Sequence, residues 1–558
     1  MVVSTAQQLE DSYQLWQRFS FSTDSRSWDA VAVPSWVGDR LNAAFAIIIP
    51  LALVRFWTVI LSLILYYSLK KQPDPKPDPL AATLWNKRAD LVDSVIETIA
   101  FKETDWSRPW VLISVFLALA AWAAQTATGV LVPPLIILDH AAPVRPGAIY
   151  APDPTPTDNS IQAARFALEV PRFLRALGSA VVDKDLRQKV QVSSAEPLGQ
   201  TQNGEILQID YSYGATGADL GIQKYFDLTL NVTGSCVTEY TWFIGTQVTE
   251  FNNNSIAIDY YDTPFNNPNN LLSASLLDGR EPSATFYVNP NSTKGALDGS
   301  NSTWGAIVSS VNRTSFSIGT DPWYLTDPSS GTTGTQSVRR GRPAISCWED
   351  KIWSYHGHTS TTDVLTGDAL PGLNLSKSLQ GLLAQYLGVP TVFLVGSHLQ
   401  TSALLSSTTA LDQIFDAGAS SLHDDLERLV VAAYVVTVNC LTDTTLYPAA
   451  QGNVPNVVLG DSGQVPKDAA DFVVWSSDVA TLSTVVIIVI PTIFVGIWFF
   501  SILLLYWTPV KTVVEKLDSS ALQDHLNEDR PSATTPGDIE KAGEPETKSE
   551  PAPKPTLG

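Results

Sequence analysis

Cysteine and basic residues are scarce in this chain of 558 residues. Three cysteines are too few for a disulfide-rich scaffold, although an oxidising compartment would allow one bridge. Lysine and arginine number 35 against 56 aspartate and glutamate residues, so the formal net charge is −21. Because no basic stripe or nucleic-acid motif is visible either, we expect no nucleic-acid partner.

The sequence also lacks two kinds of signal. No basic segment, short apolar core and small-residue cleavage site follow one another near Met1, so we expect no removable signal peptide. No nucleophile, base and orienting group can be placed together, so we expect no catalytic site. We expect no bound metal and no cofactor.

Long apolar runs are present and account for a mean hydropathy of +0.06, which is high for a soluble protein. Three runs cover residues 43–69, 110–137 and 481–507. Each exceeds the roughly 20 helical residues that cross the hydrocarbon of a bilayer. The sequence therefore predicts three membrane-spanning helices.

Lysine and arginine set the predicted orientation. They are concentrated in residues 70–109, a loop with one predicted helix, and such an excess is typical of the cytosolic side. Residues 1–42, a short arm, and residues 138–480, a large domain, then lie outside the cytosol. Residues 508–558 form a cytosolic tail that is largely disordered, because few of them are apolar.

Arg55 is the one charge deep inside a predicted span, where an unpaired guanidinium is costly. Gln125 lies at a matching depth in the second span, so we predict a hydrogen bond that joins the two helices. One alternative is that Arg55 lines an ion or substrate path. Another is that it splits the first run into a re-entrant hairpin, which would put residues 1–42 in the cytosol.

Glycosylation signals fall within the predicted exterior domain. Six Asn-x-Ser/Thr triplets occur, and they lie at Asn231, Asn253, Asn291, Asn301, Asn312 and Asn374. A segment rich in these residues produces some triplets by chance, but none occurs elsewhere in the chain. The asymmetry predicts N-glycosylation and supports the extracytosolic location.

All three cysteines lie in the same domain. Cys236 and Cys347 are both in strand-like sequence, and we predict a disulfide between them that leaves Cys440 as a thiol. The alternative is that all three are buried as small hydrophobic residues.

Local patterns predict an α+β exterior domain with a β-rich first half and a helical second half. Residues 161–177 have helical periodicity. Residues 189–355 are short Tyr-, Val- and Thr-rich runs separated by Gly, Asn and Pro, which favours antiparallel strands. Residues 376–442 favour helices, one of them capped by Ser420 or Ser421.

Two motifs resemble functional sites. Residues 460–463, Gly-Asp-Ser-Gly, match the nucleophile segment of trypsin-like proteases, but the flanking motifs are missing and we interpret them as a turn. The second motif has the ligand types of a zinc site, although exposed loop histidines are the simpler interpretation. It consists of His356 and His358 with Glu349, Asp350 and Asp363 nearby.

The densest aromatic cluster contains Cys347, Trp348, Trp353 and Tyr355. We interpret it as core packing around a disulfide, with a carbohydrate-stacking surface as the alternative. The string Cys-Trp-x-x-x-x-Trp-Ser-Tyr, followed by helices and a late span, resembles a group of uncharacterised multi-span membrane glycoproteins of filamentous fungi. This resemblance implies a membrane glycoprotein and no particular activity.

These patterns together predict a non-enzymatic integral membrane glycoprotein of the plasma membrane or secretory pathway. Its exterior domain would bind a protein or carbohydrate partner, as an accessory protein of a fungal pathway. One alternative is a subunit of an oligomeric transporter or channel, which would use Arg55. A membrane-tethered hydrolase is a further alternative.

Overall fold

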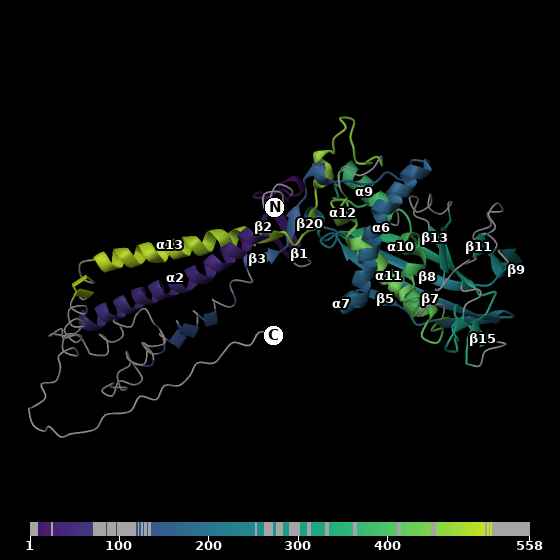
Figure 1. Ribbon diagram of the computed structural model, residues 1–558. Coiled ribbons are helices and arrows are strands. Elements are labelled where there is room, and N and C mark those ends of the chain that lie inside the picture. The colour runs from purple at the N-terminus through teal and green to yellow at the C-terminus, as the bar shows by residue number, and fades with distance from the viewer. Residues whose placement is uncertain are drawn as a thin grey trace, which may run out of the picture. The chain divides into compact units, whose positions relative to one another are not determined.

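The computed structural model describes residues 9–23, 26–70, 136–251, 254–261, 272–274, 283–289, 302–309, 314–329, 334–360, 365–409, 414–447, 454–507 and a few other positions. The chain divides into two compact units. Unit 1 comprises Met1–Ala46 and Leu131–Ile490, and unit 2 comprises Ile47–Val130 and Pro491–Gly558. All the described strands belong to unit 1 (Figure 1).

An eight-stranded sheet dominates unit 1. Its strands follow the order β12, β13, β17, β8, β7, β5, while β18 pairs with β17 and β6 with β7. The bounds are β5 Val190–Val192, β6 Glu196–Thr201, β7 Gly204–Thr216, β8 Thr229–Glu239, β12 Ser283–Val288, β13 Ser302–Ser309, β17 Ala344–Tyr355 and β18 His358–Ser360. The strands from β5 to β17 lie in residues 189–355, for which the sequence predicts β structure.

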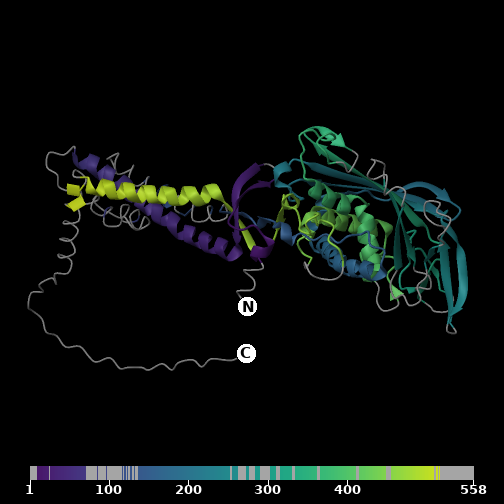
Figure 2. The same cartoon turned by 90° about the horizontal axis from the view of Figure 1, so that it is seen from above.

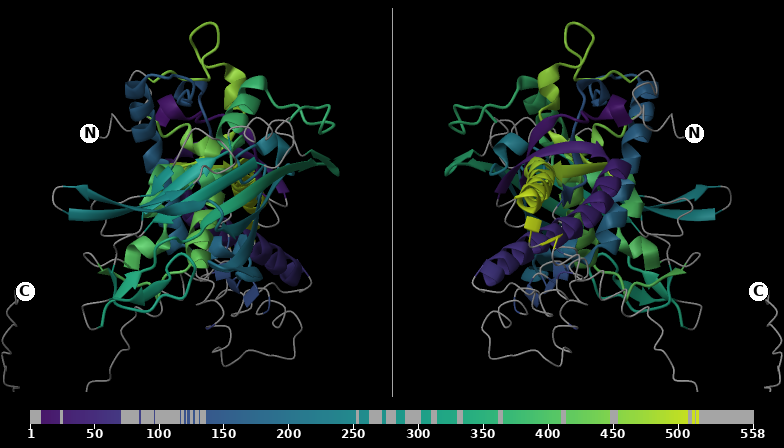
Figure 3. Two further views of the ribbon diagram at one scale, coloured as in Figure 1. Left: turned by 90° about the vertical axis from the view of Figure 1, so that its right-hand side faces the viewer. Right: turned by 90° about the vertical axis from the view of Figure 1, so that its left-hand side faces the viewer.

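Side chains alternate along these strands and give the sheet a buried face and an open face. In β7, Ile209, Tyr211 and Tyr213 are buried, whereas Asp210 and Ser212 alternate with them on the other side. The left view of Figure 3 shows the sheet in front of the helices.

Helices α6 (Asn159–Val182), α10 (Thr391–Leu399) and α11 (Leu422–Val438) cover the buried face (Figure 2). Helix α11 packs against α6, α10, β5 and β7, and α10 packs against β12. Twelve of the 17 residues of α11 are buried, as expected of a helix that is apolar on most sides. Ser421 is its N-cap and accepts a hydrogen bond from the backbone N–H of Asp424 at 3.0 Å.

Two charges on β17 stabilise the break between α9 (Lys377–Leu387) and α10. Glu349 Oε1 accepts from the backbone N–H of Thr391 at 2.8 Å, at the N-terminus of α10. Lys351 Nζ donates to the carbonyl oxygens of Leu387 and Val389 at 2.7 and 2.6 Å, at the C-terminus of α9. Each charge opposes the partial charge of the helix end that it meets.

The same helix pair, Lys377–Leu387 with Thr391–Thr408, is apolar and long enough to cross a membrane if its 61° bend is ignored. Its side chains Leu382, Leu383 and Val395 belong instead to the main hydrophobic core of unit 1. The apolar character of this pair is therefore explained by burial within the protein.

A second, four-stranded sheet brings together distant parts of the chain. Its order is β1 (Arg18–Thr23), β2 (Arg26–Pro34), β21 (Val479–Ser483) and β3 (Ile137–Asp139). Strands β1 and β2 lie in the amino-terminal arm, for which the sequence analysis predicts no strands. The remaining strands are β4 Ala141–Pro143, β9 Phe243–Phe251, β10 Asn254–Tyr261, β11 Leu272–Ala274, β14 Thr314–Ser315, β15 Thr326–Pro328, β16 Gln336–Val338, β19 Ile414–Phe415 and β20 Val473–Trp475.

Two described helices are long and apolar enough to cross a membrane as single elements. Helix α2 (Ser35–Lys70) follows β2 directly and begins before the apolar run, and α13 (Thr484–Tyr506) follows β21. The candidate spans are Ser35–Leu63 and Thr484–Leu504. In unit 2, Val59 and Leu504 pack together, and the rings of Tyr66 and Trp507 are 5.6 Å apart.

Several predicted features lie outside the described residues. Most of residues 71–135 do so, including most of the predicted second span and of the cytosolic helix, and so does most of the tail after residue 507. These features stay predictions.

Candidate functional site

The aromatic string on β17 divides between the two faces of the large sheet. Trp353 and Tyr355 are buried in the core, whereas Trp348 is 38% exposed on the open face. Because side chains alternate, Trp348 points away from its neighbours Cys347 and Glu349. Core packing therefore accounts for Cys347, Trp353 and Tyr355, but it does not account for the exposed side chain of Trp348.

A disulfide joins Cys236 of β8 to Cys347 of β17, the pair favoured by the sequence analysis. The two residues are direct cross-strand partners, and their Cα atoms are 4.1 Å apart. Cys440 is a buried free thiol whose pKa is raised to about 12, mainly by burial. The disulfide ties together the two central strands beneath Trp348.

Trp348 lies in a largely polar surface. Ser235 is opposite Trp348 on β8, and Asp210 is opposite Ser235 on β7. The next row toward the C-terminus of β17 consists of Asp350, Thr233 and Ser212. The register thus places one indole ring among hydroxyl and carboxylate groups.

A groove of about 800 Å³ lies over this surface. Trp348, Asp210, Gln208, Ser212 and Thr233 are among its lining residues. Gln208 Nε2 donates to Asp210 Oδ1 at 2.8 Å, which orients the amide and the carboxylate relative to each other. The volume is in the range of small-molecule sites.

A small hydrophobic cluster closes the other end of the same face. Ala344 and Ile307 pack there against Tyr261 and Trp242. A Cβ added to Gly305 would lie 2.9 Å from the Trp242 ring, so glycine permits this close contact. This cluster bounds the open part of the face at the Ala344 end of β17.

Two of the six predicted glycosylation sites, Asn231 and Asn374, lie within the described residues. Asn231 of β8 is exposed and alternates on the same side of the strand as Thr233 and Ser235. Asn374 is exposed before the start of α9. Asn253, Asn291, Asn301 and Asn312 lie outside the described residues.

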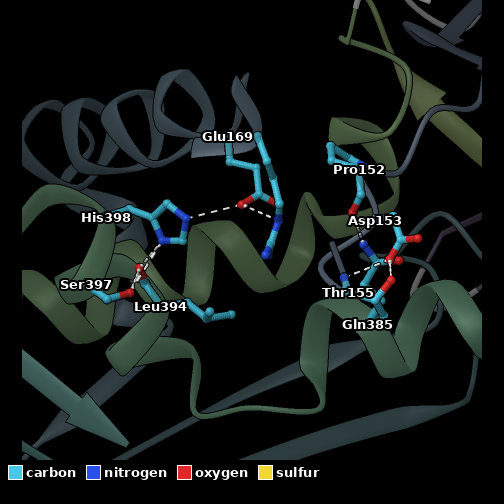
Figure 4. Close-up of polar contacts among 9 residues, drawn as sticks. Pro152, Asp153, Thr155, Glu169, Gln385, Leu394, Ser397 and His398 are labelled. Carbon is cyan, nitrogen blue, oxygen red and sulfur yellow. Dashed lines mark hydrogen bonds and ion pairs between the residues drawn. The ribbon is translucent and has the colours of Figure 1, made fainter. Parts of the chain in front are cut away.

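A polar cluster around the largely buried His398, between α6 and α10, was not predicted from the sequence (Figure 4). His398 Nδ1 lies 2.9 Å from the carbonyl oxygen of Leu394, and Nε2 lies 3.2 Å from Glu169 Oε2. Ser397 Oγ donates to the same carbonyl at 3.1 Å. Each ring nitrogen of His398 therefore faces an oxygen atom of the protein.

The surroundings of His398 give the cluster a structural role. The imidazole stacks against Phe166 and Phe173 with ring centroids 5.1 and 4.3 Å away. Burial raises the pKa of Glu169, but the His398 hydrogen bond and the positive charge of Arg172 hold it below its ordinary value. A general base needs a ring nitrogen within reach of a nucleophile, and both ring nitrogens of His398 lie instead against Leu394 O and Glu169 Oε2. The arrangement fits helix packing better than hydrolysis.

The other sequence motifs do not come together as sites. His356 and His358 are exposed at the β17–β18 turn, and His356 Nε2 is 3.0 Å from Asp227 Oδ2. Glu349 points into the core, and Asp363 lies outside the described residues. Among the residues that the structure describes, only one group has metal-ligand spacing, and it is His423, Asp424 and Glu427 on one turn of α11.

Residues 460–463 form a turn, in agreement with the interpretation made from the sequence. The backbone N–H of Gly460 donates to Gln464 O at 3.0 Å, and Gly463 has φ 71°. Positive φ favours glycine at that position.

Arg55 has an exposed side chain on α2. Gln125 lies outside the described residues. Their predicted hydrogen bond stays a prediction.

Comparison with known proteins bears on the region that contains the groove. A family model matches residues 170–474, which is more than half of the chain. The chain belongs to DUF8406, a domain of unknown function. The DUF8406 segment contains the whole large sheet, both disulfide cysteines and Trp348. No curated protein and no solved structure matches the chain.

Proposed function

We propose that this protein is an integral membrane glycoprotein whose unit 1 lies outside the cytosol and binds a neutral carbohydrate in the groove over Trp348. The observation that carries the proposal is the 38% exposed indole of Trp348 in a polar groove of about 800 Å³. A carbohydrate of a cell wall or of another glycoprotein is the partner class. The accessory role in a fungal pathway rests on the resemblance alone.

The chemistry of the groove suits a sugar. The face of an indole ring packs well against the C–H groups on one face of a pyranose. Asp210, Gln208, Ser212 and Thr233 offer acceptors and donors for sugar hydroxyl groups. The groove has no lysine or arginine among its lining residues, while Asp210 and Glu427 are acidic. An uncharged saccharide therefore fits it better than an anionic one.

Strand pairing supports three membrane crossings. Strands β2 and β3 are both in the four-stranded sheet, and α2 begins directly after β2. A chain that leaves this sheet along a spanning α2 has to cross the bilayer again before it returns to β3. Residues 110–137 are the apolar run available for that return. The β21–α13 connection then gives the third crossing.

The distribution of charge and the positions of the sequons support one orientation of the protein in the membrane. The basic residues of the 70–109 loop favour the cytosolic side for the C-terminal end of α2. Unit 1, with Asn231 and Asn374, would then lie in the secretory lumen or at the cell surface. Protease added to sealed microsomes should leave unit 1 intact, and an endoglycosidase should shift its gel mobility. Digestion of unit 1 with no such shift would reverse the orientation.

Carbohydrate binding can be tested with the full-length protein in detergent. Fluorescent chitohexaose, laminarihexaose and mannohexaose serve as neutral probes in a polarisation titration. We expect at least one to bind and Trp348→Ala to weaken it about tenfold or more, because the ring contact is lost. Trp475→Ala is the matched control, since Trp475 is 60% exposed in unit 1 but does not line the groove. Equal binding by both variants, or binding of none of the probes, would reject the proposal.

A further inference from the structure

We infer that an N-linked glycan on Asn231 covers the groove and that its first sugars stack on Trp348. This inference rests on the proposed extracytosolic location of unit 1. It deepens the proposed carbohydrate-binding function, because it names what regulates access to the same groove.

The positions of the two side chains carry the argument. Asn231 pairs with Ile352 on β17, and Trp348 pairs with Ser235 on β8. The two residues therefore lie on adjacent strands, on the same side of the sheet, four positions apart along β8. Four residues of a strand span about 13 Å. An asparagine side chain extended by two sugar rings covers a distance of this order.

The surface between them is suited to a sugar chain. Thr233 and Asp350 form the only intervening outward row on these two strands, and both side chains are short and polar. Thr233 is the hydroxyl residue of the Asn231 sequon and also lines the groove. Gly214, opposite Asn231 on β7, has no side chain and leaves room beside Asn231 for the base of a glycan.

A glycan held in this position would occupy part of the groove. It would cover the exposed indole, and a free saccharide would have to displace it. Asn374 provides an internal comparison, because it is an exposed sequon outside the large sheet, just before α9.

The test measures how fast each glycan is removed from the folded protein. Full-length protein from a eukaryotic host is treated with endoglycosidase H in detergent without denaturation, and the Asn231 and Asn374 glycopeptides are followed by mass spectrometry. We expect release at Asn231 to be about three- to tenfold slower than at Asn374, the size of one aromatic stacking contact. Trp348→Ala should bring the two rates within about twofold, whereas Trp475→Ala should leave the difference unchanged.

Several outcomes would overturn the inference. They are an Asn231 without sugar when Asn374 carries one, equal release rates in the unaltered protein, and a rate difference that survives Trp348→Ala. The rate at Asn374 and the thermal midpoint show whether Trp348→Ala is folded. If it is not, Trp348→Phe takes its place and should give an intermediate rate at Asn231.

A second measurement separates this inference from the proposed function. Asn231→Gln removes the glycan and should strengthen oligosaccharide binding several-fold. If no oligosaccharide binds even to Asn231→Gln, while Trp348 still protects the Asn231 glycan of the unaltered protein, the proposed function fails and the inference stands. If oligosaccharides bind equally well with and without the Asn231 glycan, the inference fails and the proposed function stands.

Discussion

The buried carboxyl group of Asp425 makes the stability of unit 1 depend on pH. Asp425 lies in the first turn of α11 with no exposed surface. It accepts hydrogen bonds from the Tyr324 hydroxyl, from the Ser406 backbone N–H at 2.9 Å and from Ser406 Oγ at 3.2 Å. Burial nevertheless raises the pKa of Asp425 from 3.8 to about 7, because desolvation of the charge outweighs these bonds.

The direction of this pH dependence follows from proton linkage. Between about pH 4 and pH 7 the folded state holds a proton on Asp425 that the unfolded state has released. The free energy of unfolding therefore falls as pH rises through this window. Above about pH 7, Asp425 contributes no further change. A rise of about 3 pKa units corresponds to about 4 kcal/mol. The pKa of Asp443, raised to about 6 mainly by burial, adds a dependence in the same direction.

Replacement of Asp425 by asparagine removes the buried charge. The amide can still accept from the Ser406 N–H, and its NH₂ can donate to the Tyr324 or Ser406 hydroxyl. We expect Asp425→Asn to raise the free energy of unfolding at pH 8 by up to about 4 kcal/mol, or roughly 5 to 10 °C in thermal midpoint. Near pH 4.5 the variant and the unaltered protein should unfold at similar temperatures.

The assay is thermal unfolding of the full-length protein in detergent, followed by tryptophan fluorescence from pH 4.5 to pH 8. Asp424→Asn is the matched control, because it removes the same charge from the same turn where the side chain is 46% exposed. Should Asp425→Asn show the same pH dependence as Asp424→Asn, the argument from burial would be refuted.

Two further predictions concern the large sheet and use the same unfolding assay. Replacing both Cys236 and Cys347 by alanine should lower the free energy of unfolding by about 2 to 5 kcal/mol, because the bridge closes a loop with a sequence separation of 111; an unchanged midpoint would contradict this. Gly234→Ala should cost roughly 2 to 4 kcal/mol, because the new Cβ would lie 2.2 Å from the Tyr211 ring, which bonds Glu349. Gly245→Ala, where a Cβ meets nothing within 4 Å, should be nearly neutral.

Local signals predicted much of unit 1. Alternation and turn residues indicated the strands between residues 189 and 355, and Ser421 was one of the two caps proposed for α11. These features depend on contacts close in sequence, such as the bond from the Asp424 N–H to the Ser421 hydroxyl. Helix and strand types therefore follow largely from the sequence.

The groove was harder to predict, because it depends on register. A shift of one residue in β17 would turn Trp348 inward and Cys347 outward. The signal that could have identified the groove is the disulfide itself. If Cys347 faces the core, its neighbour Trp348 must face the other side, and Asp350 must lie on the same side as Trp348.

The pairing of β2 with β21 could not be predicted, because nothing local links Ala30 with Ser483. In the sequence, the amino-terminal arm is a short mixture of polar and apolar residues before an apolar run. Its strand β2 meets β21 only in the folded chain. Asp425 and Asp443, the buried acids to which the pH dependence is assigned above, were likewise missed, because an acidic first turn usually faces solvent.

The long separation between β2 and β21 also bears on how the protein is made. A ribosome adding about 5 to 20 residues per second needs roughly 20 to 90 seconds to proceed from one strand to the other. During that interval the β1–β2 hairpin keeps an unpaired edge that invites association with other nascent chains. A transcript that stops before Val479 would leave this edge permanently uncovered, and quality control should degrade its product even though every strand of the large sheet has been synthesised.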